Sequence, residues 1–239
     1  MRSFSKVVVG GLLWLAFSAL AFGDTLYISA QTENVSGGGQ FSATLASNPA
    51  QDLLIYCVDF QNYTYFAPYP VNISTPDVTN PASVANTRYG TTPDADFTYD
   101  PNSLPAVQRY VMAAWLVTQY DFSSGVSNND LEIQNSIWTL LNTSGSTSGF
   151  PNGDSAGTGT YVTQAISWLN GQSQIALQQF GAGVQIFDST DVAGTDIPAR
   201  WTTGFQEMIT VTTTPEPGTL TLLGAGLLGL GLIRRRFRN

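Results

Sequence analysis

The residue with the clearest chemical potential is Cys57, the only cysteine among 239 residues. It lies in the run Leu54-Ile55-Tyr56-Cys57-Val58-Asp59-Phe60. A lone cysteine cannot form an intramolecular disulfide, so it is a small buried apolar residue, an intermolecular crosslink, a catalytic thiol or half of another bond. The rest of the composition decides among these roles.

The chain contains no histidine. A nucleophilic thiol needs a general base, usually histidine, and one thiol without imidazoles falls far short of a zinc ligand set. No spacing singles out a pair of acidic residues for hydrolysis. We therefore expect no enzyme, no metal and no cofactor. The remaining chemical option is a thioester, in which a cysteine sulfur attacks the amide carbon of a glutamine and ammonia leaves.

Two short motifs agree with that option. Tyr56-Cys57-Val58-Asp59 resembles the aromatic-Cys-aliphatic-acidic motif of the thioester domains on bacterial surface proteins. Ile133-Gln134-Asn135-Ser136-Ile137-Trp138 resembles their second motif, Thr-Gln-x-Ala-Ile-Trp, with isoleucine and serine in place of the threonine and alanine. The resemblance implies a thioester between Cys57 and Gln134 in a β-rich domain with a helical insertion. It also implies that Asp59 follows the cysteine and that Trp138 packs the helix against the site.

A second segment imitates the same motif. Thr163-Gln164-Ala165-Ile166-Ser167-Trp168 has different spacing, so Gln164 is a rival acyl donor. Gln134 is favoured because it keeps the three-residue step to Ile137-Trp138. An inert, buried Cys57 is the alternative to both. The protein would then be a non-covalent structural component of an exopolysaccharide or biofilm matrix. Four aromatic residues could stack on sugar rings, although a place in the core is favoured for them: Tyr63, Tyr65, Phe66 and Tyr69.

The only lysine is Lys6, near the start of the chain. A thioester persists only while nucleophiles are kept away, and the rest of the chain offers no side-chain amine. The scarcity of lysine fits a thioester, and it fits equally a secreted acidic protein that uses little lysine. It excludes Lys-Asn isopeptide crosslinks within the body.

The N-terminal segment, residues 1–23, has the features of a secretory signal peptide. Arg2 and Lys6 precede an apolar run from Val7 to Phe22, and Ala21-Phe22-Gly23 forms a cleavage pattern. The alternative is a retained membrane anchor. We expect cleavage by signal peptidase before Asp24.

The C-terminal segment, residues 212–239, contains Pro215-Glu216-Pro217, an apolar stretch from 219 to 233, and a basic cluster. The basic residues are Arg234, Arg235, Arg236 and Arg238. This order predicts a short transmembrane helix with its arginines in the cytoplasm. It resembles the PEP-CTERM sorting signal of Gram-negative bacteria. That resemblance implies recognition by an exosortase in the inner membrane, cleavage near the triplet, and release or surface attachment of the body. The alternative is a plain membrane anchor.

The body between the two ends is acidic. Of the 17 acidic residues, 16 lie within residues 24–214, against three arginines, so the net charge of this part is −13. Such a surface excludes nucleic acid as a plausible partner. We expect the partner to be a component of a surface or matrix that presents an amine, a hydroxyl or a polysaccharide.

The body, residues 24–211, is expected to be one α+β domain. Apolar alternation predicts strands, and spacings of three and four predict helices. The strands are expected at 25–30, 40–45, 52–60, 69–73, 184–187 and 205–211, and the helices at 105–120, 129–141 and 160–179, the last with a break at Gly171. This order predicts a β-rich domain, sandwich or barrel-like, with an inserted section of about three helices, and strands from both ends paired in one sheet system.

Overall fold

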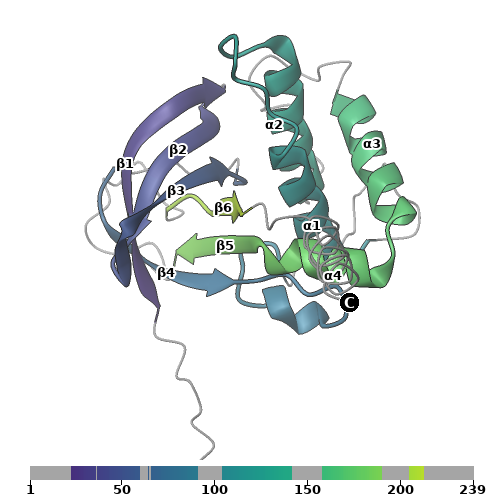
Figure 1. The fold of residues 1–239 in the computed structure, drawn as a ribbon, viewed down its shortest axis with the longest axis horizontal. Coiled ribbons are helices and arrows are strands. Elements are labelled where there is room, and N and C mark those ends of the chain that lie inside the picture. Colours follow the sequence, from purple (N-terminus) through teal and green to yellow (C-terminus); the bar gives the residue numbers. More distant parts are fainter. Residues whose placement is uncertain are drawn as a thin grey trace, which may run out of the picture.

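The computed structural model describes residues 23–35, 37–59, 64, 66–90, 104–141, 158–189 and 205–212. It shows a closed barrel of six strands with four α-helices packed beside it (Figure 1). The expected signal peptide, apart from its last residue, and the expected C-terminal transmembrane helix lie outside the described residues. Within the described ranges, no helix has the length and apolar character needed to cross a membrane.

The six strands are all paired antiparallel, in the order β1-β2-β3-β6-β5-β4 around the barrel. They are β1 (Asp24–Val35), β2 (Gly38–Leu45), β3 (Asn48–Cys57), β4 (Tyr69–Ser74), β5 (Val184–Ser189) and β6 (Met208–Val211). The last strand of the chain lies beside the strand that ends at Cys57, and their register places Cys57 opposite Met208. Strands from both ends of the body therefore form one sheet, as predicted.

The helical section is inserted between β4 and β5. It contains a short 3-10 helix η1 (Pro81–Val84), then α1 (Ala106–Val117), α2 (Asn128–Leu141), α3 (Thr158–Gly171) and α4 (Gln174–Ala182). The expected third helix is thus two helices, because Ser173 caps a new one: its hydroxyl accepts a hydrogen bond from the Ala176 backbone N–H at 3.2 Å. The described part of the section holds four α-helices instead of about three.

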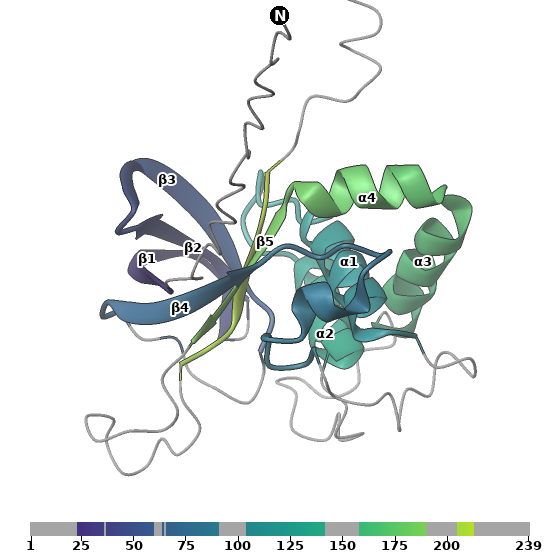
Figure 2. The ribbon, with the colours of Figure 1, turned by 90° about the horizontal axis from the view of Figure 1, so that it is seen from below.

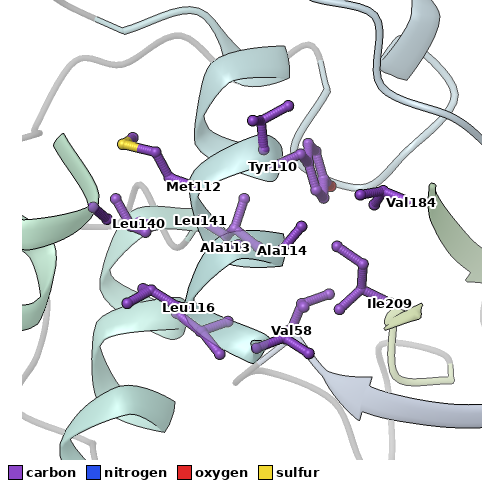
Figure 3. Packing of buried hydrophobic residues seen from close by; sticks show 14 of the residues in the cluster. Val58, Tyr110, Met112, Ala113, Ala114, Leu116, Leu140, Leu141, Val184 and Ile209 are labelled. Carbon is purple, nitrogen blue, oxygen red and sulfur yellow. The ribbon is translucent and has the colours of Figure 1, made fainter. Parts of the chain in front are cut away.

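The helices form a second layer beside the barrel, with its own apolar core (Figure 2). Buried residues of α1 and α2 fill this core. Figure 3 shows Val58 and Ile209 pointing into it from the barrel side. Cys57, one residue before Val58, belongs instead to the barrel core. The chain therefore passes from one core to the other at Cys57.

The barrel core receives one large side chain from the helices. Trp138 of α2 is buried among barrel residues that include Cys57 and Met208. Gly38 of β2 makes room for it, since a Cβ atom there would lie 2.8 Å from Cζ2 of the indole. Trp138 thus packs α2 against the barrel beside Cys57.

Candidate functional site

Cys57 is fully buried at the end of β3, and its sulfur contacts polar groups of three residues. The side-chain nitrogen Nε2 of Gln206 lies 2.5 Å from Sγ. The thiol donates to the backbone oxygen of Asp59 at 3.4 Å, and the Trp138 indole N–H donates a hydrogen bond to the sulfur. The sulfur is thus enclosed and surrounded by hydrogen-bonding groups.

Burial strongly raises the pKa of the Cys57 thiol. The negative charge of Asp59 raises this pKa further, while hydrogen bonds donated to the sulfur by the Trp138 indole and by the Asp59 backbone oppose the rise. The sulfur is therefore a protonated thiol at neutral pH, and any reaction at this sulfur has to move the thiol proton as the new bond forms.

Gln134 of α2 is buried next to the backbone of Cys57. Its Nε2 donates to the Cys57 backbone oxygen at 3.0 Å, and its Oε1 accepts from the Gly39 N–H at 2.8 Å and from the Tyr120 hydroxyl at 2.9 Å. These bonds join α2, β2 and β3. The structure thus places Gln134 next to Cys57 and holds its nitrogen against the backbone of the cysteine.

The amide that contacts the sulfur belongs to Gln206, just before β6. Its Nε2 also donates to the Asp59 backbone oxygen at 2.7 Å, and its Oε1 accepts a hydrogen bond from the Thr64 hydroxyl. Because the amide C–N bond is about 1.33 Å long, the amide carbon lies at most about 3.8 Å from Sγ. The sequence did not single out Gln206.

The other two residues named from the sequence are Gln164 and Tyr56. Gln164 is exposed on α3, whereas the Cys57 thiol is buried. The Tyr56 ring stacks on Tyr120 with centroids 5.6 Å apart, and its hydroxyl accepts a hydrogen bond from Gln40. Tyr56 thus supports the residue that holds the Gln134 amide.

Asp59 is fully buried and its carboxylate is paired. Its Oδ2 lies 3.1 Å from Nε of Arg88, and its Oδ1 accepts a hydrogen bond from the Tyr89 hydroxyl at 2.8 Å. A buried carboxylate needs such partners to stay charged. This pairing fixes the backbone oxygen of Asp59, which is the oxygen that receives the Gln206 amide.

Glu207 is a second buried acid beside Gln206. It accepts hydrogen bonds from the Tyr110 hydroxyl at 2.6 Å and from the Arg88 backbone N–H at 2.8 Å. Burial raises the pKa of Glu207 well above its usual range, and the nearby Asp188 carboxylate adds to the rise. Burial also raises the pKa of Asp188, against the effect of Arg88. Burial of both carboxyls next to each other therefore favours the protonated form of each.

The segment 205–207 is held by hydrogen bonds on every residue. The Phe205 backbone oxygen accepts from Arg88 at 3.0 Å, and that of Glu207 accepts from the Val58 N–H at 3.2 Å. The backbone oxygen of Gln206 accepts from the Tyr69 hydroxyl at 3.5 Å. The side chain of Gln206 is thus presented to the sulfur from a fixed backbone.

The sequence contained one signal for this segment. In a strand, alternate residues face opposite sides, and Phe205-Gln206-Glu207-Met208-Ile209 sets two polar residues among apolar ones on both faces. Both Gln206 and Glu207 are buried. Adjacent polar residues inside an apolar strand mark a place where both faces are covered and both side chains need partners.

The aromatic residues considered for sugar stacking separate in the structure. Tyr69 is buried in the barrel core and stacks on Phe205 with centroids 4.3 Å apart. Phe66 has 57% of its surface exposed. Tyr63 and Tyr65 lie outside the described residues. Among the described members of this set, Phe66 is the one that presents a ring to solvent.

Comparison with known proteins identifies the C-terminal end of the chain. Residues 213–236 match the PEP-CTERM protein-sorting motif. No curated protein and no solved structure matches the chain. The match confirms the sorting signal predicted from Pro215, Glu216, Pro217 and the terminal arginines. The chain therefore carries the C-terminal signal of an exported protein that is sorted by an exosortase.

Proposed function

We propose that the body of this exported protein forms an internal thioester between Cys57 and Gln206 and uses it to attach covalently to a surface or matrix partner. The observation that carries the proposal is the contact of a buried amide with a buried thiol, Nε2 to Sγ at 2.5 Å. The likeness of residues 56–59 to the cysteine motif of thioester domains supports the sulfur side of this bond.

Formation of the bond follows from the contacts at the sulfur. Sγ attacks the amide carbon of Gln206, the C–N bond breaks, and ammonia leaves with the thiol proton. The amide nitrogen lies 2.5 Å from Sγ, so the proton has a short path to the leaving group. This route suits a thiol with a raised pKa, because it needs no separate thiolate and no histidine.

The surroundings hold both reactants in place. Reacting atoms about 3–3.5 Å apart in a fixed orientation gain much of their rate from positioning alone. Gln206 is fixed through its own amide and through the anchored segment 205–207, while Cys57 is fixed by β3 and by the Gln134 amide on its backbone oxygen. The bond would link residues 149 positions apart and so restrict the unfolded chain, as a disulfide does.

Gln134, which the motif resemblance implies as the acyl donor, is the alternative to Gln206. Its oxygen has two hydrogen-bond donors, the Gly39 N–H and the Tyr120 hydroxyl, which would polarise its carbonyl. Its nitrogen, however, points to the backbone of Cys57 and not to Sγ. We assign it instead the role of holding β2, β3 and α2 together around the thioester.

The thioester reacts once per molecule, so the protein acts as a single-use attachment device and not as an enzyme. An amine or hydroxyl of the partner would attack the carbonyl of Gln206 and release the Cys57 thiol. We propose that this takes place at the cell surface or in the extracellular matrix of a Gram-negative bacterium. Signal peptidase and an exosortase of the inner membrane would first process the two ends of the chain, the transmembrane helix leaving with the sorting tail or being retained as the anchor.

Intact mass spectrometry of the protein purified without reductant tests the bond. We expect a deficit of one ammonia, which disappears on treatment with methylamine and is absent in Cys57→Ala. An unmodified mass with a thiol that titrates after denaturation would contradict the proposal. That result would leave Cys57 as an inert core residue, and the protein as a non-covalent matrix component.

Peptide sequencing after methylamine treatment identifies the acyl donor. The amine converts the glutamine of the thioester into N-methylglutamine, so the modified residue can be located among Gln206, Gln134 and Gln164. We expect the label at Gln206. A label at Gln134 would keep the thioester and reassign its acyl side, and unlabelled protein that still lacks ammonia would show that the amine does not reach the bond.

A further inference from the structure

Thr64 is the described residue whose hydroxyl contacts the carbonyl oxygen of the Gln206 amide. The hydroxyl donates to Oε1 across 142 residues of sequence. At the other end of the same amide, Nε2 faces Sγ of Cys57 and the backbone oxygen of Asp59. Thr64 therefore lies opposite the sulfur, on the far side of the carbon that would react.

The orientation of the Gln206 amide is fixed by chemistry. The backbone oxygen of Asp59 can only accept hydrogen bonds, so the group that lies 2.7 Å from it has to be the NH₂ end of the amide. The carbonyl oxygen is then the end that faces Thr64, and the hydroxyl has to be the donor. Thr64 thus contacts the atom on which negative charge develops during attack at the amide carbon.

Thr64 also differs from its neighbours in exposure. Cys57, Asp59 and Gln206 are buried, whereas Thr64 is half-buried. The carbonyl oxygen of Gln206 therefore faces a half-buried residue, whereas its nitrogen faces buried ones. A partner nucleophile that approaches from the side of Thr64 would meet the carbonyl next to the Thr64 hydroxyl.

We propose that Thr64 is a catalytic residue of the thioester site, acting as the hydrogen-bond donor to the developing oxyanion. This inference rests on the proposed thioester. When Sγ adds to the amide carbon, the carbonyl oxygen gains negative charge and the Thr64 hydrogen bond strengthens. After ammonia leaves, the same hydroxyl polarises the thioester carbonyl. When an amine adds to it, the C–S bond breaks, the amine loses a proton to the sulfur, and Thr64 again stabilises the charged oxygen.

The test compares Thr64→Val, which removes the hydroxyl at nearly constant shape, with Thr64→Ser, which keeps it. The full-length protein is purified without reductant, and intact mass gives the fraction that lacks ammonia and the rate at which methylamine removes the bond. Loss of one oxyanion donor slows such reactions by roughly 100-fold or more. We expect Thr64→Val to form the bond incompletely or to react with methylamine roughly 100-fold more slowly, and Thr64→Ser to behave like the unchanged protein.

A purely structural role would lower the melting temperature of Thr64→Val without changing the methylamine rate of its folded fraction. If Thr64→Val is unstable, Thr64→Ala replaces it, since it also lacks the hydroxyl. Equal rates in the unchanged protein and Thr64→Val, or an equally slow Thr64→Ser, would overturn the inference and leave the thioester intact. Absence of the ammonia deficit in the unchanged protein would overturn both the inference and the proposed function.

Discussion

Two buried glutamine amides flank Cys57, one from the helix side and one from the strand side. The helix-side amide, Gln134, is bonded at both ends to groups that do not react: two donors on its oxygen and a backbone carbonyl on its nitrogen. The strand-side amide, Gln206, has its nitrogen against the sulfur. Both are equally buried, so burial alone does not distinguish a structural amide from a reactive one.

The difference lies in how each amide is held. Gln134 is fixed by its own hydrogen bonds, and its removal would leave several buried backbone groups without partners. Gln206 also makes hydrogen bonds of its own, to Asp59 and Thr64. In addition, Arg88 and Tyr110 hold the residues on either side of it. The residue whose amide carbon would react is thus also supported by Arg88 and Tyr110, which do not take part in the reaction. Substitution of Gln206 should therefore mainly reduce formation of the thioester, and substitution of Gln134 should mainly reduce the free energy of unfolding.

The largest expected effect is on the strand side. Gln206→Ala removes the amide carbon that faces Sγ, so the ammonia deficit should disappear completely while the fold is retained. Intact mass gives the deficit, and circular dichroism gives the helix and strand content. The matched change Gln134→Ala should keep the ammonia deficit in the fraction of the protein that folds. A deficit that survives in Gln206→Ala and vanishes in Gln134→Ala would reverse the comparison.

The next effect is on the helix side and concerns stability. Gln134→Ala leaves the Cys57 backbone oxygen and the Gly39 N–H buried without a partner, and each such group costs about 1–3 kcal/mol. We expect the free energy of unfolding to fall by about 2–6 kcal/mol for the two groups together. Urea unfolding in a Cys57→Ala background measures it without any contribution from the thioester. A loss below about 1 kcal/mol would mean that the Gln134 amide does not hold the strands.

A smaller effect is expected from Gly38, which lies beneath the helix-side amide. A Cβ atom at this position would lie 2.7 Å from Oε1 of Gln134, closer than packing allows. Gly38→Ala should therefore lower the free energy of unfolding by about 1–3 kcal/mol, as overpacking generally does. Gly171→Ala is the matched control, because a Cβ there meets nothing within 4 Å. Equal stability of the two variants would show that α2 can shift away from β2.

The elements around the helix-side amide were accessible from the sequence. The three- and four-residue spacing of Ile133, Ile137 and Leu140 is that of an amphipathic helix, and all three are buried in α2. Such a local pattern predicts a helix and the side chains on its buried face. The strands at 25–30, 40–45 and 184–187 could also be predicted, because the alternation of apolar and polar residues is likewise a local pattern.

The strand-side amide was not accessible in this way. Gln206 reaches Cys57 only because β6 pairs with β3 and closes the barrel, a contact across 149 residues that no local pattern contains. Arg88, which anchors the segment, comes from a proline-rich connection with no periodicity. Polar residues that act through long-range pairing leave little trace in a single sequence beyond their unusual place among apolar neighbours.

The anchoring of the strand side should also depend on pH. Burial raises the pKa of Glu207 above its value in the unfolded chain, near 4.5, and the pKa of Asp188 is raised as well. A raised carboxyl pKa contributes stability that is fully present below the unfolded value and is lost as pH rises toward the folded value. The free energy of unfolding should therefore decline as pH increases above about 4.5.

Glu207→Gln tests this dependence, because an amide has no proton to lose. We expect a smaller decline of stability between about pH 4.5 and pH 8, measured from urea midpoints at each pH. Tyr110, Arg88 and Asp59 also face this carboxyl, and the raised pKa of Asp188 retains part of the slope. Asp52→Asn, which removes an exposed carboxylate of β3, controls for the loss of charge. An unchanged slope in Glu207→Gln would place the titrating group elsewhere.

The smallest effect is expected at the third glutamine. Gln164 is exposed on α3, and surface substitutions of this kind usually change the free energy of unfolding by no more than about 0.5 kcal/mol. Gln164→Ala should keep both the ammonia deficit and the stability of the unchanged protein, measured by intact mass and urea unfolding. Loss of the deficit in this variant would mean that α3 leaves its place in the second layer to reach Cys57. Its retention would confine the acyl donor to the two amides that flank the sulfur.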